Sequence, residues 1–565
     1  MTAITEDQLD YQLLTAELDD EDLLFAGVLE DFALGTGIDG PSSLHEALKC
    51  DESHKWRTAV DAELNQIEKM GTWSIVEAPA DANIVSCKYV FRLKKDEHGN
   101  IVKHKARLVA RGFTQKFGID YFDTRVWIVR WETLRNLLAQ AASRGSVIHQ
   151  ADVKNAYLNA EIKEDIYIDL PPLYHEFRAL PPNPNNKRLV CKLAKGLYGT
   201  KQAGRGWYMK LRDTFISLGY KVCNADLGVF YRFSGKKYTI VAVATDDLTI
   251  IAESVKSAQL IKTQLNEHFE LVDLGEIKWL LGVHITRDYE NRTISLEQQT
   301  YIDDIVERFE LEDACPISTP MEPGVDLTPG APHVSPIKLT ARERSQYREM
   351  IGALLYCSGV TRADVAYVIS TLSRYLEEPS KTHHAAVLRS VRYLKGTRDH
   401  RLVLGGKDPT LRAYSDADWA SQAHRHSISG FAIFHGCGVV SWSSKKQPIV
   451  TLSSTESEYV ALTHVVKDLL WHRKLHNELS PFFDPITTPI PLFCDNQGAI
   501  VLSKDSTFHM RTKHIDTRFH FVRETVNNNI LSISYCPTDE MIADILTKAL
   551  ARFKFAKFHS LLGIH

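Results

Sequence analysis

Two groups of acidic residues stand out in this chain of 565 residues, because each member lies near the end of a predicted strand or helix. The first group is Asp152, Asp246 and Asp247, and the second group is Asp416, Glu456, Asp495 and Asp544. Carboxylates that converge in this way can hold two divalent ions about 4 Å apart around a transferring phosphoryl group. An all-carboxylate site suits both Mg²⁺ and Mn²⁺, so the two groups predict two sites for such ions.

The first group has an alternative explanation in turn formation. Asp246 and Asp247 follow the apolar run YTIVAVAT and precede LTIIAE, so they occupy the tip of a predicted hairpin, where Asp is favoured for its local hydrogen bonds. A second strand-end acid, Asp152 in VIHQADV, shifts the balance toward metal binding. Tyr157, five residues further on, is either a core tyrosine or a ring that packs under a nucleotide sugar and excludes a 2′-hydroxyl.

In the second group, Glu456 has the strongest alternative. Ser453 and Glu456 match the Ser-x-x-Glu pattern of a helix capping box, although capping and metal binding can both hold. The other three acids come from different elements of one α/β segment and have apolar flanks, which favours a metal site over solvated surface. In such a site one ion activates water and the other stabilises the leaving oxygen of a phosphodiester. His514 and Asp516 form a further candidate pair, for which the alternative is a basic helix face that touches phosphates.

Composition excludes several classes of protein. No uncharged apolar run approaches the ~20 residues of a membrane span, and the acidic start lacks the order of a signal peptide, so we expect an intracellular protein without a membrane partner. The nine cysteines have neither disulfide-framework nor zinc-site spacing. The net charge of −4 hides an uneven distribution, since residues 1–48 contain no Lys or Arg, whereas residues 87–116 carry nine against two acids. The basic segment predicts contact with nucleic-acid phosphates.

The carboxylates need a scaffold, and hydrophobic periodicity predicts one. A helix over 44–67 precedes two β-like runs, which we expect to pair as a basic hairpin. Pro, Gly and Ser/Thr residues mark a linker around 315–336, and 343–400 is mostly helical. From Leu411, strands and helices alternate as expected of a separate α/β domain.

Nine blocks of sequence, in order, resemble the reverse transcriptase and RNase H region of a copia-type LTR retrotransposon Pol polyprotein. They are KARLVARGFTQKFGIDY, QADVKNAYLNAEIKEDIYI, CKLAKGLYGTKQAGRGWY, DLGEIKWLLGVHI, YSDADWA, SSTESEYVAL, CDNQGAI, RTKHIDTRFHFVRE and TDEMIADILTKAL. The resemblance implies an α+β right-hand polymerase of fingers, palm and thumb, followed by an α/β RNase H-like domain. The expected divisions are a disordered acidic extension (1–42), fingers and palm (43–270), a thumb-like segment (271–314), a linker (315–342), a helical connection (343–405) and an RNase H-like domain (406–565).

The resemblance also implies functions for individual residues. The first carboxylate group matches the polymerase metal ligands of the family, and the second group matches its four RNase H carboxylates. The residues expected at the nucleotide are Lys94, Lys95, Arg107, Tyr157, Gly199, Lys201 and Gln202. The implied activity copies RNA into DNA from dNTPs and degrades the RNA of the hybrid. The implied partners are an RNA template, a DNA primer, the RNA–DNA hybrid and other element-encoded proteins such as capsid or integrase, in a cytoplasmic virus-like particle or the nucleus.

Several residues depart from the family pattern. Ala244–Thr245 occupies the place where the family usually has an aromatic residue and Val before the paired Asp. The segment TRVWIVR (124–130) replaces a family sequence close to TFAPVAR. The segment QAGRGW, with Gly204 and Gly206, replaces QAPRQW. Replacing Pro by Gly raises the entropy cost of fixing a loop by about 0.4–1 kcal/mol. The departures leave two alternatives open: a catalytically decayed nucleic-acid-binding remnant and a nuclease-only protein. Since we find no protease or zinc-binding integrase signature, we expect a processed product or a truncated copy of a longer polyprotein.

Overall fold

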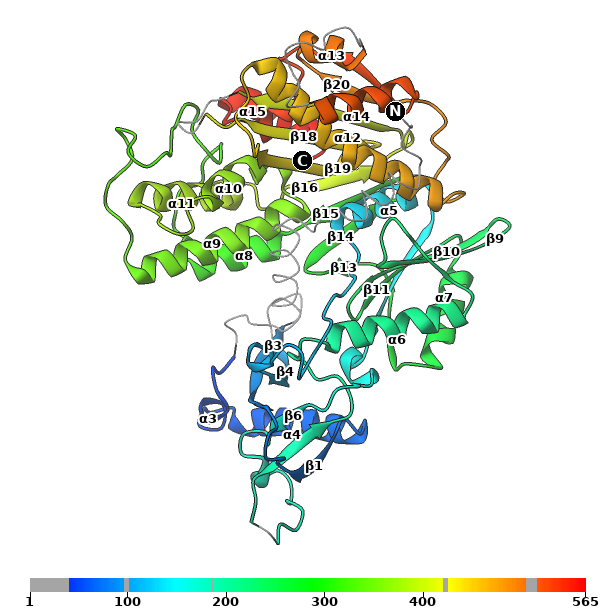
Figure 1. The fold of residues 1–565 in the computed structure, drawn as a ribbon, viewed down its shortest axis with the longest axis vertical. Coiled ribbons are helices and arrows are strands. Elements are labelled where there is room, and N and C mark those ends of the chain that lie inside the picture. Colours follow the sequence, from blue (N-terminus) through cyan, green and yellow to red (C-terminus); the bar gives the residue numbers. More distant parts are fainter. Residues whose placement is uncertain (1–39, 96–100, 185, 420–424, 505–515) are drawn as a thin grey trace.

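The computed structural model describes residues 40–95, 101–184, 186–419, 425–504 and 516–565. The predicted acidic extension lies almost entirely outside these ranges. The chain has the expected α+β right-hand fold, with the N-terminal elements (blue in Figure 1) at one end, the palm sheet in the middle and the C-terminal sheet (yellow to red) at the other end. None of the helices within the described ranges is long and apolar enough to cross a membrane.

The fingers are built on one amphipathic helix. Helix α4 (Ser53–Lys69) buries Trp56, Val60, Leu64 and Ile67, whose spacing of three to four residues places them on one face. That face packs on the predicted basic hairpin of β3 (Cys87–Lys95) and β4 (Ile101–Ala110). A second sheet has the order β1-β7-β6-β2. The remaining elements of the fingers are α3 (Leu44–Ala47), β1 (Trp73–Glu77), β2 (Ile84–Val85), β6 (Tyr167–Asp169) and β7 (Leu189–Leu193).

The palm is a six-stranded sheet in the order β12-β5-β11-β10-β9-β8. Its elements are α5 (Trp131–Arg144), β5 (Val147–Val153), α6 (Ala203–Ser217), β8 (Lys221–Val222), β9 (Val229–Ser234), β10 (Lys237–Ala244), β11 (Asp247–Ala252), α7 (Val255–Asn266) and β12 (Leu271–Glu276). Successive side chains of the strands point to opposite faces, so Val241 packs with α6 and α7 while Ala242 joins the cluster that contains α5. The predicted palm boundary at residue 270 is wrong by one strand, because Leu271 in β12 pairs with Val153.

The predicted thumb-like segment and helical connection form one body. Strand β16 (Arg401–Gly405) pairs with β15 (Thr293–Glu297), so a sheet in the order β13-β14-β15-β16 joins the two segments. The helices of both segments pack against one another (green in Figure 1). The other elements of this helical body are β13 (Trp279–Leu280), β14 (Val283–Asp288), α8 (Gln299–Arg308), α9 (Ala341–Val360), α10 (Ala366–Ser373) and α11 (Lys381–Gly396).

The predicted linker, 315–342, is an ordered strap along α11 rather than a free connection. Met321 and Leu327 are buried in the main core. Arg392 on α11 donates from Nε to the Cys315 carbonyl at 2.7 Å. Proline and glycine exclude regular secondary structure here, but they do not prevent the apolar side chains between them from being buried.

The RNase H-like domain has a five-stranded sheet in the order β19-β18-β17-β20-β21. Strands β17, β18 and β19 are antiparallel, whereas β20 and β21 run parallel to β17. The elements are β17 (Leu411–Asp418), β18 (Ile428–His435), β19 (Gly438–Lys446), α12 (Ser454–Glu478), β20 (Ile490–Cys494), α13 (Gln497–Lys504), α14 (Asp516–Asn527), β21 (Leu531–Tyr535) and α15 (Arg552–Leu561).

Helix α5 connects this domain to the palm. Apart from Glu132 and Arg144, every residue of α5 is buried. The Arg135 guanidinium donates to the Val440 carbonyl at 2.7 Å and lies 4.0 Å from the centroid of the Trp442 ring. One continuous cluster of buried side chains includes α5, the helical body and the C-terminal sheet. The predicted separate α/β domain therefore shares its core with the rest of the chain.

Candidate active sites

The first carboxylate group gathers at one edge of the palm sheet. Strand pairing places Asp247 directly opposite Asp152, because β5 and β11 are antiparallel neighbours. Asp246 lies at the tip of the β10–β11 hairpin, and its carbonyl accepts a hydrogen bond from the Val153 amide at 2.9 Å. The predicted hairpin is therefore confirmed, and the strand register brings the three backbone positions together.

Electrostatics tie this edge to the fingers. Burial raises the pKa of Asp246, and the neighbouring charge of Asp152 raises it further, whereas the cations Arg107 and Lys105 lower it. Arg107 comes from β4 of the basic hairpin, and its guanidinium lies 4.9 Å from the centroid of the Tyr198 ring. The hairpin thus directs positive charge toward the palm carboxylates, where it opposes their mutual repulsion.

The aromatic rings beside these carboxylates contact each other. Tyr157 lies on a short 3-10 helix after β5 and meets Tyr198 edge to face, with 5.1 Å between ring centroids. Tyr157 is half-buried, which is compatible with both of its predicted roles.

The other predicted nucleotide contacts have structural roles in this conformation. A Cβ on Gly199 would lie 2.2 Å from the Ala110 carbonyl, so the glycine permits the close approach of two backbones. The Gln202 amide is buried and donates to the Asp120 carbonyl at 2.7 Å, so contact with a nucleotide would require this bond to open. Lys201 is exposed, and its Nζ lies 4.9 Å from the Tyr121 ring centroid. The side chains of Lys94 and Lys95 lie outside the described residues.

Two of the departures from the family pattern contact each other. A Cβ on Gly204, at the start of α6, would lie 2.7 Å from Cγ2 of Val126. The absence of a side chain at residue 204 therefore makes room for the larger residue at 126. A third departure, Thr245, has a φ of 59°, which is unfavourable for a β-branched residue. The Trp207 indole stabilises that turn by donating to the Thr245 carbonyl at 2.7 Å.

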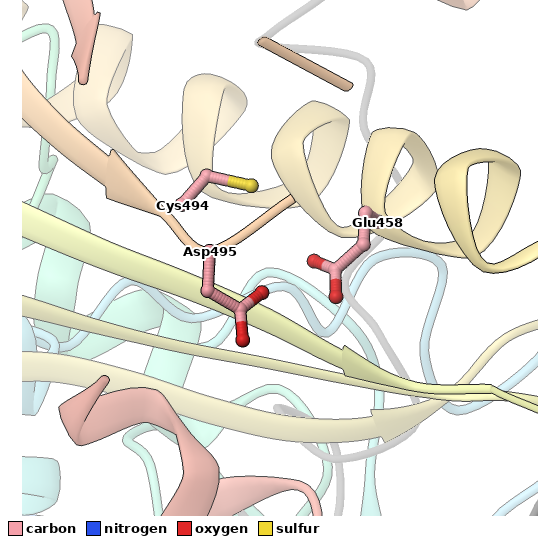
Figure 2. A group of neighbouring side chains, drawn as sticks. All are labelled: Glu458, Cys494 and Asp495. Carbon is pink, nitrogen blue, oxygen red and sulfur yellow. The ribbon is translucent and has the colours of Figure 1, made fainter. Parts of the chain in front are cut away.

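The second carboxylate group lies on the C-terminal sheet. One ligand atom from each of Asp416, Asp495 and Asp544 lies within 4.8 Å of the others. Glu458, Cys494 and Asp495 form a second such group. Figure 2 shows the Glu458 and Asp495 carboxylates facing each other from α12 and from the end of β20. Among the described residues, groups as tight as these occur on this sheet and not at the palm edge.

The prediction of Glu456 as a metal ligand is corrected in favour of Glu458. Glu456 caps α12, since its carboxylate accepts from the Leu452 amide at 2.7 Å and its own amide donates to the Ser453 hydroxyl. Positions 456 and 458 are about 200° apart around a helix, so the two side chains point in nearly opposite directions. Glu458 shares the buried face of α12 with Leu462, four residues further on. Glu456 is buried as well, so the two glutamates are distinguished by the capping bond of Glu456 and by the position of Glu458 beside Asp495.

The carboxylates of this sheet are held under electrostatic strain. Burial raises the pKa of Asp416 to about 7, with opposition from Lys548 and a further rise from Asp544. Burial also raises the pKa of Glu458 well above its ordinary value, and the charges of Asp416 and Asp495 add to the rise. A divalent ion would relieve this repulsion.

Two lysines and a hydroxyl, which were not predicted, contact the same acids. The Lys548 ammonium lies 2.8 Å from Oδ1 of Asp544, and the Lys554 ammonium lies 2.7 Å from its Oδ2. The Thr547 hydroxyl donates to Asp416. Asp544 lies on a five-residue 3-10 helix (Ile542–Leu546).

The donor set suits Mg²⁺ or Mn²⁺, which prefer carboxylate oxygens. Oε2 of Glu458 is buried and has no hydrogen-bond partner among the described residues. A buried carboxylate oxygen in this state is stabilised by a cation. Asp416, Glu458, Asp495 and Asp544 are therefore the residues that fit a divalent ion here. The pair His514 and Asp516 cannot be added, because His514 and the Asp516 side chain lie outside the described residues.

Comparison with known proteins agrees with this architecture. Residues 70–323 match the model of the family described as reverse transcriptase (RNA-dependent DNA polymerase). The chain is 37% identical over 527 residues to the retrovirus-related Pol polyprotein from transposon TNT 1-94 of Nicotiana tabacum, covering 93% of this chain and 39% of the relative. It is 33% identical to the polyprotein from transposon RE1 of Arabidopsis thaliana, covering 95% of this chain and 36% of the relative.

A shorter relative is matched along its whole length. The putative transposon Ty5-1 protein of Saccharomyces cerevisiae is 31% identical over 324 residues, which are 56% of this chain and 100% of the relative. The chain thus spans less than two fifths of the Arabidopsis polyprotein but the full length of the yeast protein. Together with the palm, fingers and C-terminal sheet, these similarities show that the chain belongs to the reverse transcriptase family of copia-type transposon Pol polyproteins.

Proposed function

We propose that this chain is an RNA-directed DNA polymerase with RNase H activity, which copies an RNA template from a DNA primer with dNTPs and degrades the RNA of the resulting hybrid. The observation that carries the proposal is the presence of two carboxylate groups on two different sheets. We expect it to act in a cytoplasmic virus-like particle or in the nucleus.

In the polymerase site, Asp152, Asp246 and Asp247 would hold Mg²⁺ or Mn²⁺, which supply charge stabilisation for nucleotidyl transfer. Arg107 approaches Asp246 from the fingers, so its guanidinium is suited to bind the triphosphate of an incoming dNTP. A cation fixed beside a polyphosphate stabilises the charge that develops during transfer. Tyr157, half-buried beside Tyr198, would pack under the nucleotide sugar.

In the nuclease site, Asp416, Glu458, Asp495 and Asp544 would hold the ions that activate water and stabilise the leaving oxygen. The lysines on Asp544 orient that carboxylate and lower the local negative charge. Both effects favour the approach of a phosphodiester, which is itself an anion.

The test uses one variant for each site. Asp246→Asn should abolish primer extension on an RNA template and leave RNA cleavage intact, because it removes a palm carboxylate and does not touch the C-terminal sheet. Asp495→Asn should do the reverse. Primer extension and cleavage of a labelled RNA–DNA hybrid are measured on the same preparations with Mg²⁺ and with Mn²⁺. Loss of both activities in either folded variant would refute two separate sites.

A second candidate function is a nucleic-acid-binding remnant that retains the nuclease. It is favoured by one observation, the left-handed φ of Thr245 directly before the paired aspartates. Strain there could shift Asp246 from the geometry that transfer requires. Salt-dependent binding of the hybrid without dNTP incorporation, together with RNA cleavage, would select this candidate.

A further inference from the structure

An unusual group of exposed apolar side chains lies directly after the basic hairpin. Phe113, Phe117, Ile119 and Phe122 are 79%, 71%, 61% and 61% exposed. Single exposed apolar residues are common on soluble proteins, but several large ones within ten residues mark a binding surface. We call these four residues the 113–122 platform.

The segment that carries the platform is firmly held, so the exposure is built into the fold. Gln115 is buried and donates from Nε2 to Oε1 of Gln202 at 3.1 Å. Asp120 is also buried, and its carboxylate accepts from the Lys116 amide at 2.7 Å and from Nδ2 of Asn83 at 2.6 Å. Polar side chains thus turn inward, and the large apolar ones are left facing the solvent.

The platform borders the proposed polymerase site. The Ala110 amide, at the end of β4, donates to the Tyr198 carbonyl at 2.8 Å. A Cβ on Gly112 would lie 2.2 Å from the Gly199 carbonyl, so the next residues of both segments are also in close contact. Tyr198 also contacts the Arg107 guanidinium, whose charge acts on Asp246, so the platform segment is connected to the palm carboxylates through these residues.

The charges around the platform are mainly positive. Arg111, Lys116, Lys201 and Arg125 are exposed. The exposed acid of the segment, Asp123, is paired with Arg205 at 2.9 Å. Exposed rings interleaved with cations suit a ligand that carries both flat apolar groups and phosphates. A single-stranded nucleic acid has both. A duplex offers phosphates but hides the faces of its bases, so it would leave the rings unused.

We propose that the 113–122 platform binds the unpaired part of the template strand ahead of the polymerase site, by stacking of its bases on Phe113, Phe117 and Phe122 and by contact of its phosphates with the neighbouring cations. This inference rests on the proposed polymerase function, because that function is what puts unpaired template beside the fingers. It adds a substrate contact that lies outside the two carboxylate sites.

Binding without catalysis tests the inference. A fluorescently labelled RNA template annealed to a DNA primer is prepared with a 5′ RNA overhang of about ten nucleotides, and a blunt version has the same duplex. Affinity is measured by fluorescence anisotropy in EDTA for the unaltered chain, Phe117→Ala and the double variant Phe113→Ala/Phe117→Ala. Phe553→Ala is the matched control, since Phe553 is 89% exposed on α15, in the C-terminal part of the chain.

The unaltered chain should bind the overhang substrate more tightly than the blunt one. Each platform substitution should weaken overhang binding by roughly fivefold or more and leave blunt binding unchanged, because base–aromatic stacking is lost. Phe553→Ala should change neither. Melting temperatures should be unaltered, since the rings are exposed, and this shows that the variants are folded.

Three results would overturn the inference: no preference of the unaltered chain for the overhang, equal losses for both substrates, or conversion of a dimer to a monomer at unchanged overhang affinity. The last result would identify the platform as a contact between copies of the chain. Primer extension on the same proteins separates the two proposals. If the overhang-specific losses are found but the unaltered chain does not extend primers, the platform proposal stands and the polymerase assignment fails.

Discussion

The contact between Gly204 and Val126 gives a sharp test of whether the departures from the family pattern are damage or compensation. Gly204 lies in the first turn of α6, where alanine is normally more stable than glycine by about 1 kcal/mol. A Cβ at this residue would approach Cγ2 of Val126 to 2.7 Å. Because Val is branched at Cβ, that methyl group has little freedom to rotate away.

The expected magnitude follows from these opposing effects. Overpacking of a well-packed site costs about 1–3 kcal/mol, so Gly204→Ala should lower the free energy of unfolding by about 1–2 kcal/mol in spite of its better helix propensity. In a Val126→Ala background the obstructing methyl is absent, and Gly204→Ala should raise the free energy of unfolding by up to about 1 kcal/mol. The coupling between the two positions should therefore be about 2–3 kcal/mol, at the upper end of values for contacting residues.

The assay is a double-mutant cycle measured by urea unfolding, with midpoints compared at unchanged m-values. Gly206→Ala is the control in the same helix, because its Cβ would lie 3.4 Å from the Cβ of Ala160, an ordinary contact. This control should be stabilising. If Gly204→Ala behaves like Gly206→Ala, or if its cost is the same with and without Val126, the two departures are independent and the compensation argument fails.

Three other predictions follow from buried groups. Glu458→Gln should reduce hybrid cleavage by about 100-fold or more, which is the upper limit for residues that only support a ligand. Glu456→Gln should cleave normally and keep its stability, because a glutamine oxygen can still accept the Leu452 amide; the opposite pattern of cleavage would restore Glu456 as the ligand. Arg135→Ala should lower the free energy of unfolding by about 3 kcal/mol or more, because the buried carbonyls that the guanidinium contacts would be left without a donor. A loss below about 1 kcal/mol in urea unfolding would contradict this structural role of Arg135. Burial lowers the pKa of His435 to about 3, so below the ordinary value of about 6.5 the unfolded chain takes up a proton that the folded chain does not. Between pH 7 and pH 5 the free energy of unfolding should therefore fall by about 2 kcal/mol more than it does in His435→Gln. An equal pH dependence of the two proteins in urea unfolding would contradict this prediction.

Local sequence patterns were sufficient for the strands that carry the palm carboxylates. The apolar runs around Asp152 and Asp246 are short and end in polar residues, so they predicted strands and a hairpin that the structure confirms. The shared core was not predictable in this way. Arg135 looks like a solvent-facing residue of an amphipathic helix, but its partners Gly359 and Val440 lie more than 200 residues further along the chain. Contacts over such separations leave no periodic signal in the sequence.

The error at Glu456 has a different cause. Two glutamates two residues apart both fitted the family block, and the choice between them depends on which side of α12 faces the sheet. The capping pattern was the alternative explanation for Glu456, and the structure supports it, because the Glu456 carboxylate accepts the Leu452 amide at the helix start. Burial alone does not resolve the choice, since both glutamates are buried, and what separates them is that Glu458 lies beside Asp495.

The shared core also affects how an element of this kind loses its activities. If a stop codon removed residues 406–565, the buried residues of α5 would lose the sheet that covers them, and the Arg135 guanidinium would lose a partner inside an apolar core. We therefore expect such a lesion to silence DNA synthesis together with RNA cleavage, whereas point substitutions at the nuclease carboxylates would spare synthesis. Selection for synthesis alone would then preserve the C-terminal sheet as scaffold in copies whose nuclease chemistry is already gone.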